Sequence, residues 1–294
     1  MSFLKELSEN KQAITLYKYN GNDITVDPEI SIKDVDKSSN YINICFIDLE
    51  TTGTHKKNDL IIEIALKVMH LNKHTAEESK AIYEYQSFQD PGIKIPEEAS
   101  LINGITDDMV KNHEINWEKV GDILSKSQLC VAHNASFDRA FLDRYLEQSK
   151  SKIWACSIND IDWIKRGFTN FKLELLSYWH GFYYESHRAM NDVDAMIHLL
   201  THPHYTNNKP IVELIANARK FQNRMIVKFN YNKELVELIK SQKYFFNGNT
   251  KEWSKIITED KVENEKVWLE ENIYKGTFSG LFEQITLIDK YKDR

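Results

Sequence analysis

Four acidic residues and one histidine fall in three short blocks of this chain, and their types suit the hydrolysis of a phosphodiester. A phosphodiester is an anion that repels hydroxide, so its hydrolysis needs positive charge beside the scissile phosphate. Carboxylates gathered at one point supply that charge by holding two divalent cations, which grip the attacking and leaving oxygens. The residues are Asp48, Glu50, Asp138, His187 and Asp192.

The first block is the hexapeptide 48–53, which follows the hydrophobic run 44–47. Asp48 and Glu50 are two residues apart at the end of an expected strand, so their side chains emerge on the same face. Two adjacent carboxylates repel each other, and a divalent cation removes that conflict. The ordinary alternative is a strand end followed by a Thr-Gly turn.

The second and third blocks are residues 133–138 and 187–192. Asp138 stands near the start of an expected helix, where the helix dipole alone would favour an acid. His187 stands in a loop and Asp192 in the first turn of the next helix, where an acid can simply cap the helix. A histidine can take a proton from an attacking water near neutral pH. The three blocks together are far more specific than any one of them.

The chain between residues 41 and 203 predicts a mixed α/β fold. Three strand-like runs joined by polar turns predict an antiparallel meander, and two strand–helix units follow it. Such a chain forms a mixed sheet with helices on both faces. The expected strands are 43–49, 60–70, 81–88, 129–132 and 153–156, and the expected helices are 96–103, 116–125, 136–148, 160–165, 172–179 and 191–200.

The remaining residues predict two further segments. Residues 1–40 are polar and read as an N-terminal extension, and residues 204–294 read as a linker and a small accessory domain of α+β type. Two prolines in the polar stretch 202–210 indicate the linker. The expected elements of the small domain are helices at 211–220, 233–241 and 263–274, a strand at 224–229, and a hairpin of 244–247 with 252–257.

Composition limits the classes of protein. No apolar stretch approaches the roughly 18 residues of a membrane span, so we expect no membrane association. The three cysteines are odd in number and form no Cys-x-x-Cys pair, which predicts a reducing, cytoplasmic location. The net charge of −6 disfavours a tight duplex binder, but residues 205–294 carry 16 Lys and Arg against 13 Asp and Glu. Short or single-stranded nucleic acid is therefore the expected substrate.

The three blocks resemble the exonuclease motifs of the DEDDh exonucleases, the family of the proofreading epsilon subunit of bacterial DNA polymerase III. Residues 61–64 and 102–106 add to the resemblance, which covers roughly residues 41–203. It implies a ribonuclease H-like fold and 3′→5′ removal of nucleoside monophosphates with two Mg²⁺ or Mn²⁺ ions. A polymerase or another DNA-processing protein is an implied partner.

The resemblance also implies a role for each motif residue. Asp48, Glu50, Asp138 and Asp192 would hold or orient the metal ions, and His187 would act as general base. A second set of residues would lie near the terminal nucleotide: Thr51, Thr52, His133, Asn134 and Phe137.

Two alternatives to a DNA exonuclease stay open at the level of sequence. An RNA-trimming exonuclease or oligoribonuclease would carry the same motifs, because discrimination depends on contacts to the 2′-hydroxyl group. A non-catalytic adaptor of a polymerase complex would not need the complete set of acids. The sequence does not indicate the oligomeric state, the pathway, or the task of residues 1–40 and of the C-terminal domain.

Overall fold

A computed structural model describes residues 14–26 and 39–293 of the chain. Of the predicted N-terminal extension, residues 1–13 and 27–38 lie outside the described part. The chain divides into two compact units: the first runs to Ala218 and includes Tyr291 onward, and the second is Arg219–Lys290. No helix in the described part is both long and apolar enough to cross a membrane.

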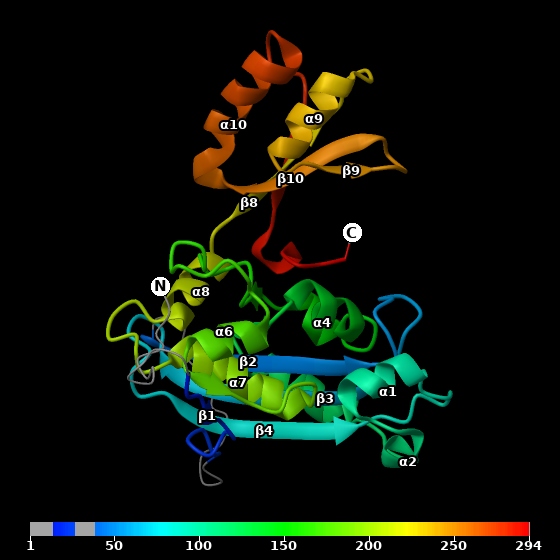
Figure 1. Cartoon of the computed structure of the whole chain (residues 1–294), viewed down its shortest axis with the longest axis vertical. Helices are drawn as coiled ribbons and strands as arrows, with labels where there is room; N and C mark the ends of the chain where they lie inside the picture. Colours follow the sequence, from blue (N-terminus) through cyan, green and yellow to red (C-terminus); the bar gives the residue numbers. More distant parts are fainter. Residues whose placement is uncertain (1–13, 27–38, 294) are drawn as a thin grey trace. The chain divides into compact units, whose positions relative to one another are not determined.

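A five-stranded mixed sheet forms the centre of the first unit (Figure 1). Its strand order is β4-β3-β2-β5-β6, with the first three strands antiparallel and the last two parallel to β2. The predicted meander and the predicted mixed α/β fold, of ribonuclease H-like type, are confirmed. The strands are β2 (Tyr41–Thr51), β3 (Ile61–Asn72), β4 (Lys80–Phe88), β5 (Leu129–Ala132) and β6 (Trp154–Cys156).

Helices cover both faces of this sheet because β2 is apolar on both sides. Ile44 and Phe46 belong to one core with helices α6, α7 and α8, whereas Cys45 and Ile47 belong to another with α3 and α4. The helices of the unit are α1 (Glu97–Asn103), α2 (Asp107–Val110), α3 (Trp117–Ser125), α4 (Ala135–Leu142), α5 (Glu147–Ser151), α6 (Leu173–Trp179), α7 (Ala189–Thr201) and α8 (Pro210–Ala218).

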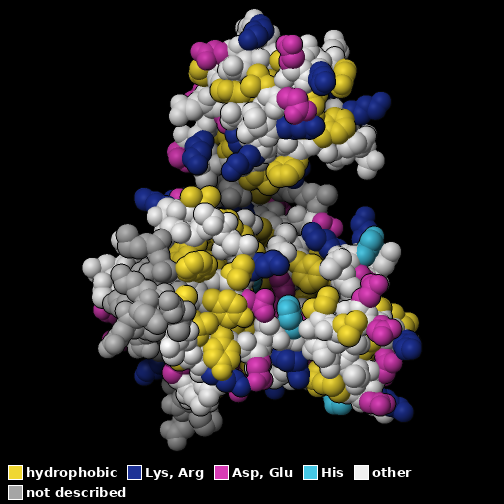
Figure 2. All heavy atoms as spheres, viewed as in Figure 1, with side chains coloured by type: hydrophobic (Ala, Val, Ile, Leu, Met, Phe, Trp, Pro, Cys, Tyr) yellow, Lys and Arg dark blue, Asp and Glu magenta, His cyan; other side chains and the backbone are white. Residues whose placement is uncertain are grey.

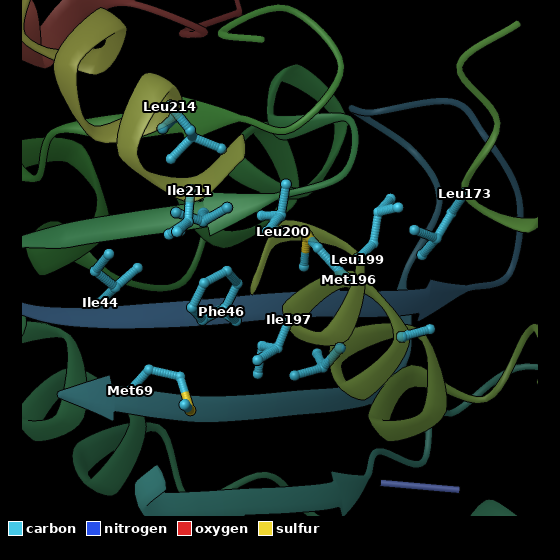
Figure 3. Close-up of a cluster of buried hydrophobic side chains, with 14 of the residues drawn as sticks. Ile44, Phe46, Met69, Leu173, Met196, Ile197, Leu199, Leu200, Ile211 and Leu214 are labelled. Carbon is cyan, nitrogen blue, oxygen red and sulfur yellow. The ribbon is translucent and has the colours of Figure 1, made fainter. Parts of the chain in front are cut away.

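Helix α7 is anchored to the sheet by a stripe of apolar side chains. Val193, Met196, Ile197 and Leu200 follow helical spacing, and all four are fully buried. Figure 3 shows Met196, Ile197 and Leu200 facing Phe46 and Met69 of the sheet and Ile211 of α8. Each such side chain contributes about 1.5–3 kcal/mol through burial. The N-terminal end of α7 is therefore held firmly in place.

Two predicted helices of the first unit differ in the structure. The segment 160–165 forms bends and turns, in which the backbone N–H of Asp162 donates to Glu213 Oε1 at 2.8 Å and the backbone N–H of Lys165 donates to Asp162 Oδ1 at 2.9 Å. A side chain that captures backbone N–H groups competes with a helix. The predicted helix 136–148 is two helices, α4 and α5, separated by turns at 143–146.

Part of the N-terminal segment joins the first unit through a pairing that the sequence did not predict. Strand β1 (Tyr17–Lys18) pairs in parallel with β7 (Phe182–Tyr183). Tyr19 is buried, and its ring stacks on His198 of α7 at a centroid distance of 4.0 Å. The segment thus packs against α7, the helix whose first turn carries Asp192.

The second unit is a four-stranded antiparallel sheet with two helices. The sheet order is β11-β8-β10-β9, and its core includes Met225, Trp253 and Leu269. The predicted hairpin is confirmed as β9 and β10, whereas β11 was not predicted because four of its five residues are exposed. The elements are β8 (Gln222–Val227), α9 (Lys233–Ser241), β9 (Phe245–Asn247), β10 (Glu252–Thr258), α10 (Val262–Leu269) with a π-helical continuation Glu270–Tyr274, and β11 (Leu281–Ile285).

The division between the units lies after α8, whereas the sequence analysis placed a domain boundary at 203/204. Ile211, Leu214 and Ile215 of α8 are buried in the core that the sheet shares with α7. Helix α8 therefore belongs to the first unit by burial.

Candidate active site

The structure brings three of the predicted carboxylates together. Asp48 and Glu50 stand near the end of β2, and Asp192 stands in the first turn of α7. One carboxylate oxygen from each of the three lies within 4.8 Å of the others. Ligands on opposite sides of an octahedral Mg²⁺ lie about 4.2 Å apart, because each Mg–O distance is about 2.1 Å. The three residues thus fit a hard divalent cation in both chemistry and spacing.

Asp138, the fourth predicted carboxylate, lies in the first turn of α4 and is buried. Its carboxylate accepts a hydrogen bond from the backbone N–H of Leu49, between Asp48 and Glu50 on β2. It is not one of the three residues whose oxygens gather within 4.8 Å. Asp138 therefore lies beside the cluster and is held against the strand that carries two of its members.

Burial and mutual repulsion disfavour the ionised forms of Asp48 and Glu50. Burial, together with repulsion from Asp192 and Asp138, raises the pKa of Asp48 well above its usual range. Burial, together with repulsion from Asp192 and Glu63, raises the pKa of Glu50 to about 8. Both shifts have the cause expected of a site that is built to hold a cation, because bound positive charge offsets burial and repulsion alike.

Asp192 is oriented by the loop that precedes α7. Its carboxylate accepts hydrogen bonds from the Tyr184 hydroxyl at 2.8 Å and from the Arg188 backbone N–H at 3.2 Å. The backbone N–H of His187 donates to the same carboxylate. These bonds leave Asp192 little rotational freedom, so its position relative to β2 is set by the fold.

His187 is exposed, and its backbone is in the left-handed region with φ of +63°. That conformation costs a non-glycine residue energy, typically about 1 kcal/mol or more, and such strain gathers at functional sites. The side chain is exposed to solvent next to the half-buried carboxylates, and when it carries a positive charge it favours the ionised form of Asp192. An exposed imidazole in this place can exchange a proton with water.

Asn103 is a functional residue to which the sequence analysis assigned no role. Its side chain is buried and hydrogen-bonds to the Glu50 carboxylate. The Asn103 carboxamide oxygen accepts the backbone N–H of Ile105 at 3.0 Å, which fixes the orientation of the amide. Asn103 belongs to the motif 102–106 that contributed to the family resemblance. A polar residue in an otherwise apolar run could have been recognised as a candidate.

Glu63 is a second such residue. It is fully buried on β3, where it is paired in register with Glu50. Its carboxylate accepts hydrogen bonds from the Arg188 guanidinium at 3.1 Å and from the Ala189 backbone N–H at 3.2 Å. Glu63 thus ties the first residues of α7 to the sheet and holds the His187 loop over the carboxylates. The sequence signal that could have identified Glu63 was an acidic residue within a strand of isoleucines.

We expect Glu63→Gln to lower kcat about 10- to 100-fold with little change in KM, because the His187 loop loses its charged anchor. The variant should also be destabilised by about 1.5–3 kcal/mol through the loss of charge-assisted hydrogen bonds. Steady-state kinetics and urea unfolding measure the two effects. Glu84→Gln, at a half-exposed acid on β4 that pairs with Lys67, is the matched control. A folded Glu63→Gln variant with wild-type kcat would exclude this positioning role.

The predicted nucleotide-contact residues divide into two groups. In the first group, Thr51, Thr52 and His133, the polar side-chain atoms form hydrogen bonds within the protein. The Thr51 hydroxyl donates to the Gly53 carbonyl at 2.6 Å, and the Thr52 hydroxyl accepts from the Leu60 N–H at 3.0 Å. Both ring nitrogens of His133 have partners, Ser157 Oγ at 2.7 Å and the Phe171 carbonyl at 2.8 Å. These hydrogen bonds hold the three side chains in place, and their contact with the terminal nucleotide stays a prediction.

The other two predicted contact residues are more accessible. Asn134 is exposed immediately before α4, and Phe137 is half-buried with its ring against Phe141 at 4.9 Å. Both are therefore available to a nucleotide. Their contact with the terminal nucleotide stays a prediction.

The chain thus combines a ribonuclease H-like mixed sheet with carboxylates clustered near the end of its central strand. Residues 45–200 match the family model described as Exonuclease. The chain belongs to this exonuclease family, and the DEDDh resemblance drawn from the motifs is confirmed.

Named relatives agree with the family. The DNA polymerase III subunit epsilon of Treponema pallidum (strain Nichols) is 31% identical over 170 residues, which cover 55% of this chain and 76% of that subunit. The PolC-type DNA polymerase III of Thermotoga petrophila is 30% identical over 142 residues, which cover 47% of this chain and 9% of that polymerase. The chain spans about a tenth of the length of the PolC-type relatives that it matches.

Among solved structures, E. coli exonuclease I in complex with a dA16 oligonucleotide is similar to this chain. The TM-score is 0.46 at 18% identity, and the match covers 62% of this chain and 48% of that one. The second unit, Arg219–Lys290, lies outside the residues that the family model matches.

Proposed function

We propose that this protein is a metal-dependent 3′→5′ exonuclease that releases nucleoside monophosphates from single-stranded or frayed DNA ends. The observation that carries the proposal is the convergence of Asp48, Glu50 and Asp192 from two different elements, with Asp138 and an exposed His187 beside them. Membership of the exonuclease family supports the reaction. The names of the relatives, DNA polymerase III subunits, support DNA as substrate and a polymerase as partner.

The carboxylates fit Mg²⁺ or Mn²⁺, with Asp48, Glu50 and Asp192 as direct ligands. Asp138 is a further residue that would hold or orient a metal ion. Two such ions, when bound, would supply the positive charge that the attacking and leaving oxygens require. His187 takes the proton of the attacking water and releases it to solvent, to which its side chain is open. Glu63 and Asn103 keep Arg188, Ala189 and Glu50 in place, so the carboxylates need little rearrangement during the reaction.

The free cysteines support a reducing cytoplasm as the place of action, because Cys45, Cys130 and Cys156 are all buried and unpaired. We place the catalytic domain in residues 41–203, extended by α8, and the accessory domain in the second unit. An RNA-trimming exonuclease is the second candidate, since discrimination between DNA and RNA depends on contacts to the 2′-hydroxyl group, which no sequence motif of this chain indicates.

Digestion of matched DNA and RNA oligonucleotides tests the proposal. Each strand carries one label at its 3′ nucleotide and another at its 5′ end, and Mg²⁺ or Mn²⁺ is added or chelated. We expect the 3′ label to appear first, as a nucleoside monophosphate, only with metal and faster from DNA. Faster release from RNA would favour the trimming enzyme. No release from either strand, in a protein that binds Mn²⁺, would exclude the exonuclease.

A further inference from the structure

The second unit carries an open hollow of about 490 Å³ whose walls are aromatic rings and lysines. This volume is within the range of about 300–1,000 Å³ that small-ligand pockets occupy. The rings come from the segment after β8, from β9 and from β10, and α9 closes the hollow on another side. The residues that carry the argument are Phe229, Tyr231, Phe246, Trp253, Lys240 and Lys251.

Some aromatic rings of this hollow pack on one another, and two rings at its edge are largely exposed to solvent. Trp253 is nearly buried, and Phe229 lies parallel to it, with ring centroids 6.4 Å apart and an angle of 8°. Phe246 packs on the same indole at 5.0 Å. Tyr231 and Phe246 nevertheless expose 85% and 52% of their surface. Two flat rings that border the hollow therefore stay exposed to solvent, and a patch of exposed rings is typical of a binding surface.

The charge of the hollow is positive. Lys240 and Lys251 line it, and no acidic side chain does. The Lys240 ammonium has one ion pair, with the exposed Glu237 at 3.4 Å, and such exposed pairs contribute little. Figure 2 shows exposed hydrophobic side chains next to Lys and Arg side chains on this unit, with Asp and Glu side chains also present on the same face. Flat rings bordered by ammonium groups match a polymer of flat bases joined by phosphates.

We infer that this hollow is a second nucleic-acid site, which binds internal nucleotides of a single strand by stacking bases on Tyr231 and Phe246 and by pairing phosphates with Lys240 and Lys251. The choice of a nucleic acid over an acidic peptide rests on the proposed function of the chain. Every ordinary nucleobase has a face that can stack, so the site accepts a strand regardless of its sequence. Its place, outside the exonuclease family match, distinguishes it from the catalytic site.

The probe is a fluorescent circular single-stranded DNA of about 30 nucleotides, long enough for several site sizes of single-strand binders. A circle has no 3′ end, so the full-length protein can be studied with its metal present and without digestion. Binding of the circle therefore depends on contacts to internal nucleotides. The catalytic and the binding hypotheses can then fail separately.

We expect Tyr231→Ala and Phe246→Leu each to weaken binding of the circle about 5- to 100-fold. Phe246→Leu keeps an apolar side chain against Trp253, and Phe246→Trp should keep the affinity. The matched control is Phe245→Ala, because Phe245 is 76% exposed but points to the other side of the same strand and does not line the hollow. The double variant Lys240→Gln/Lys251→Gln should lower the slope of log K against log salt by about 1.4.

Two further probes separate stacking from general attraction of anions. A circle of abasic sugar-phosphate units should bind weakly and equally to the wild type and to Tyr231→Ala. Polyglutamate should not displace the DNA circle at equal charge. The inference would be overturned if the wild type bound the abasic circle as tightly as the DNA circle, if polyglutamate displaced the DNA circle, or if Phe245→Ala lost as much affinity as Phe246→Leu.

Discussion

Asp192→Asn should lower kcat/KM about a thousandfold or more, because the cluster loses one of its three direct cation ligands and each 1.36 kcal/mol of lost stabilisation costs tenfold. The stability of the fold should not decrease, since the variant removes a charge from a group of half-buried carboxylates that repel one another. Kinetics on a labelled oligonucleotide and thermal unfolding without metal measure the two effects. Added Mn²⁺ should raise the Tm of the wild type, and much less that of Asp192→Asn.

Asp194 offers the matched control two residues further along α7. Its carboxylate pairs with the buried Lys67 ammonium at 2.5 Å and is no member of the cluster. Asp194→Asn should therefore lower stability by about 1.5–3 kcal/mol, since Lys67 loses one charged hydrogen-bond partner but keeps Glu84 at 3.3 Å, while kcat below the Tm stays close to wild type. Loss of activity in Asp194→Asn, with full activity in Asp192→Asn, would refute the assignment of the metal ligands.

His187→Ala should lower kcat about 10²- to 10⁴-fold, the usual contribution of a positioned proton acceptor. Metal binding should persist, because the three gathered carboxylates are unchanged. The two readouts are therefore the rate of nucleotide release and the Tm shift with Mn²⁺. A loss of both would indicate that His187 acts on the metal site rather than on the proton.

His187→Asn serves as the control for the backbone at this position. Asparagine tolerates the left-handed conformation that His187 adopts at φ +63°, but it cannot accept the proton. His187→Asn should thus be as stable as the wild type and as slow as His187→Ala. Wild-type rates in His187→Asn would exclude a general base at this position.

Local sequence patterns were sufficient to predict most of the strands and helices of the first unit. The apolar runs of β2, β3 and β4 predicted a meander, and the spacing of Asp48 with Glu50 placed both side chains on one face of a strand. These predictions worked because strand alternation and helical periodicity depend on neighbours within a few residues. The same local patterns failed at 160–165, where the side chains of Glu213 and Asp162 accept hydrogen bonds from backbone N–H groups of the segment.

The sequence by itself determined the class of fold, the family and the residues capable of holding a cation, because each of these depends on residue types at short, regular spacing. Only the tertiary structure decided how those residues are held. Glu63 meets Arg188, Asn103 meets Glu50, β1 pairs with β7, and α8 joins the first unit. The partners in these contacts are far apart along the chain. No periodicity encodes such contacts, since they form only when burial of apolar side chains has brought the elements together.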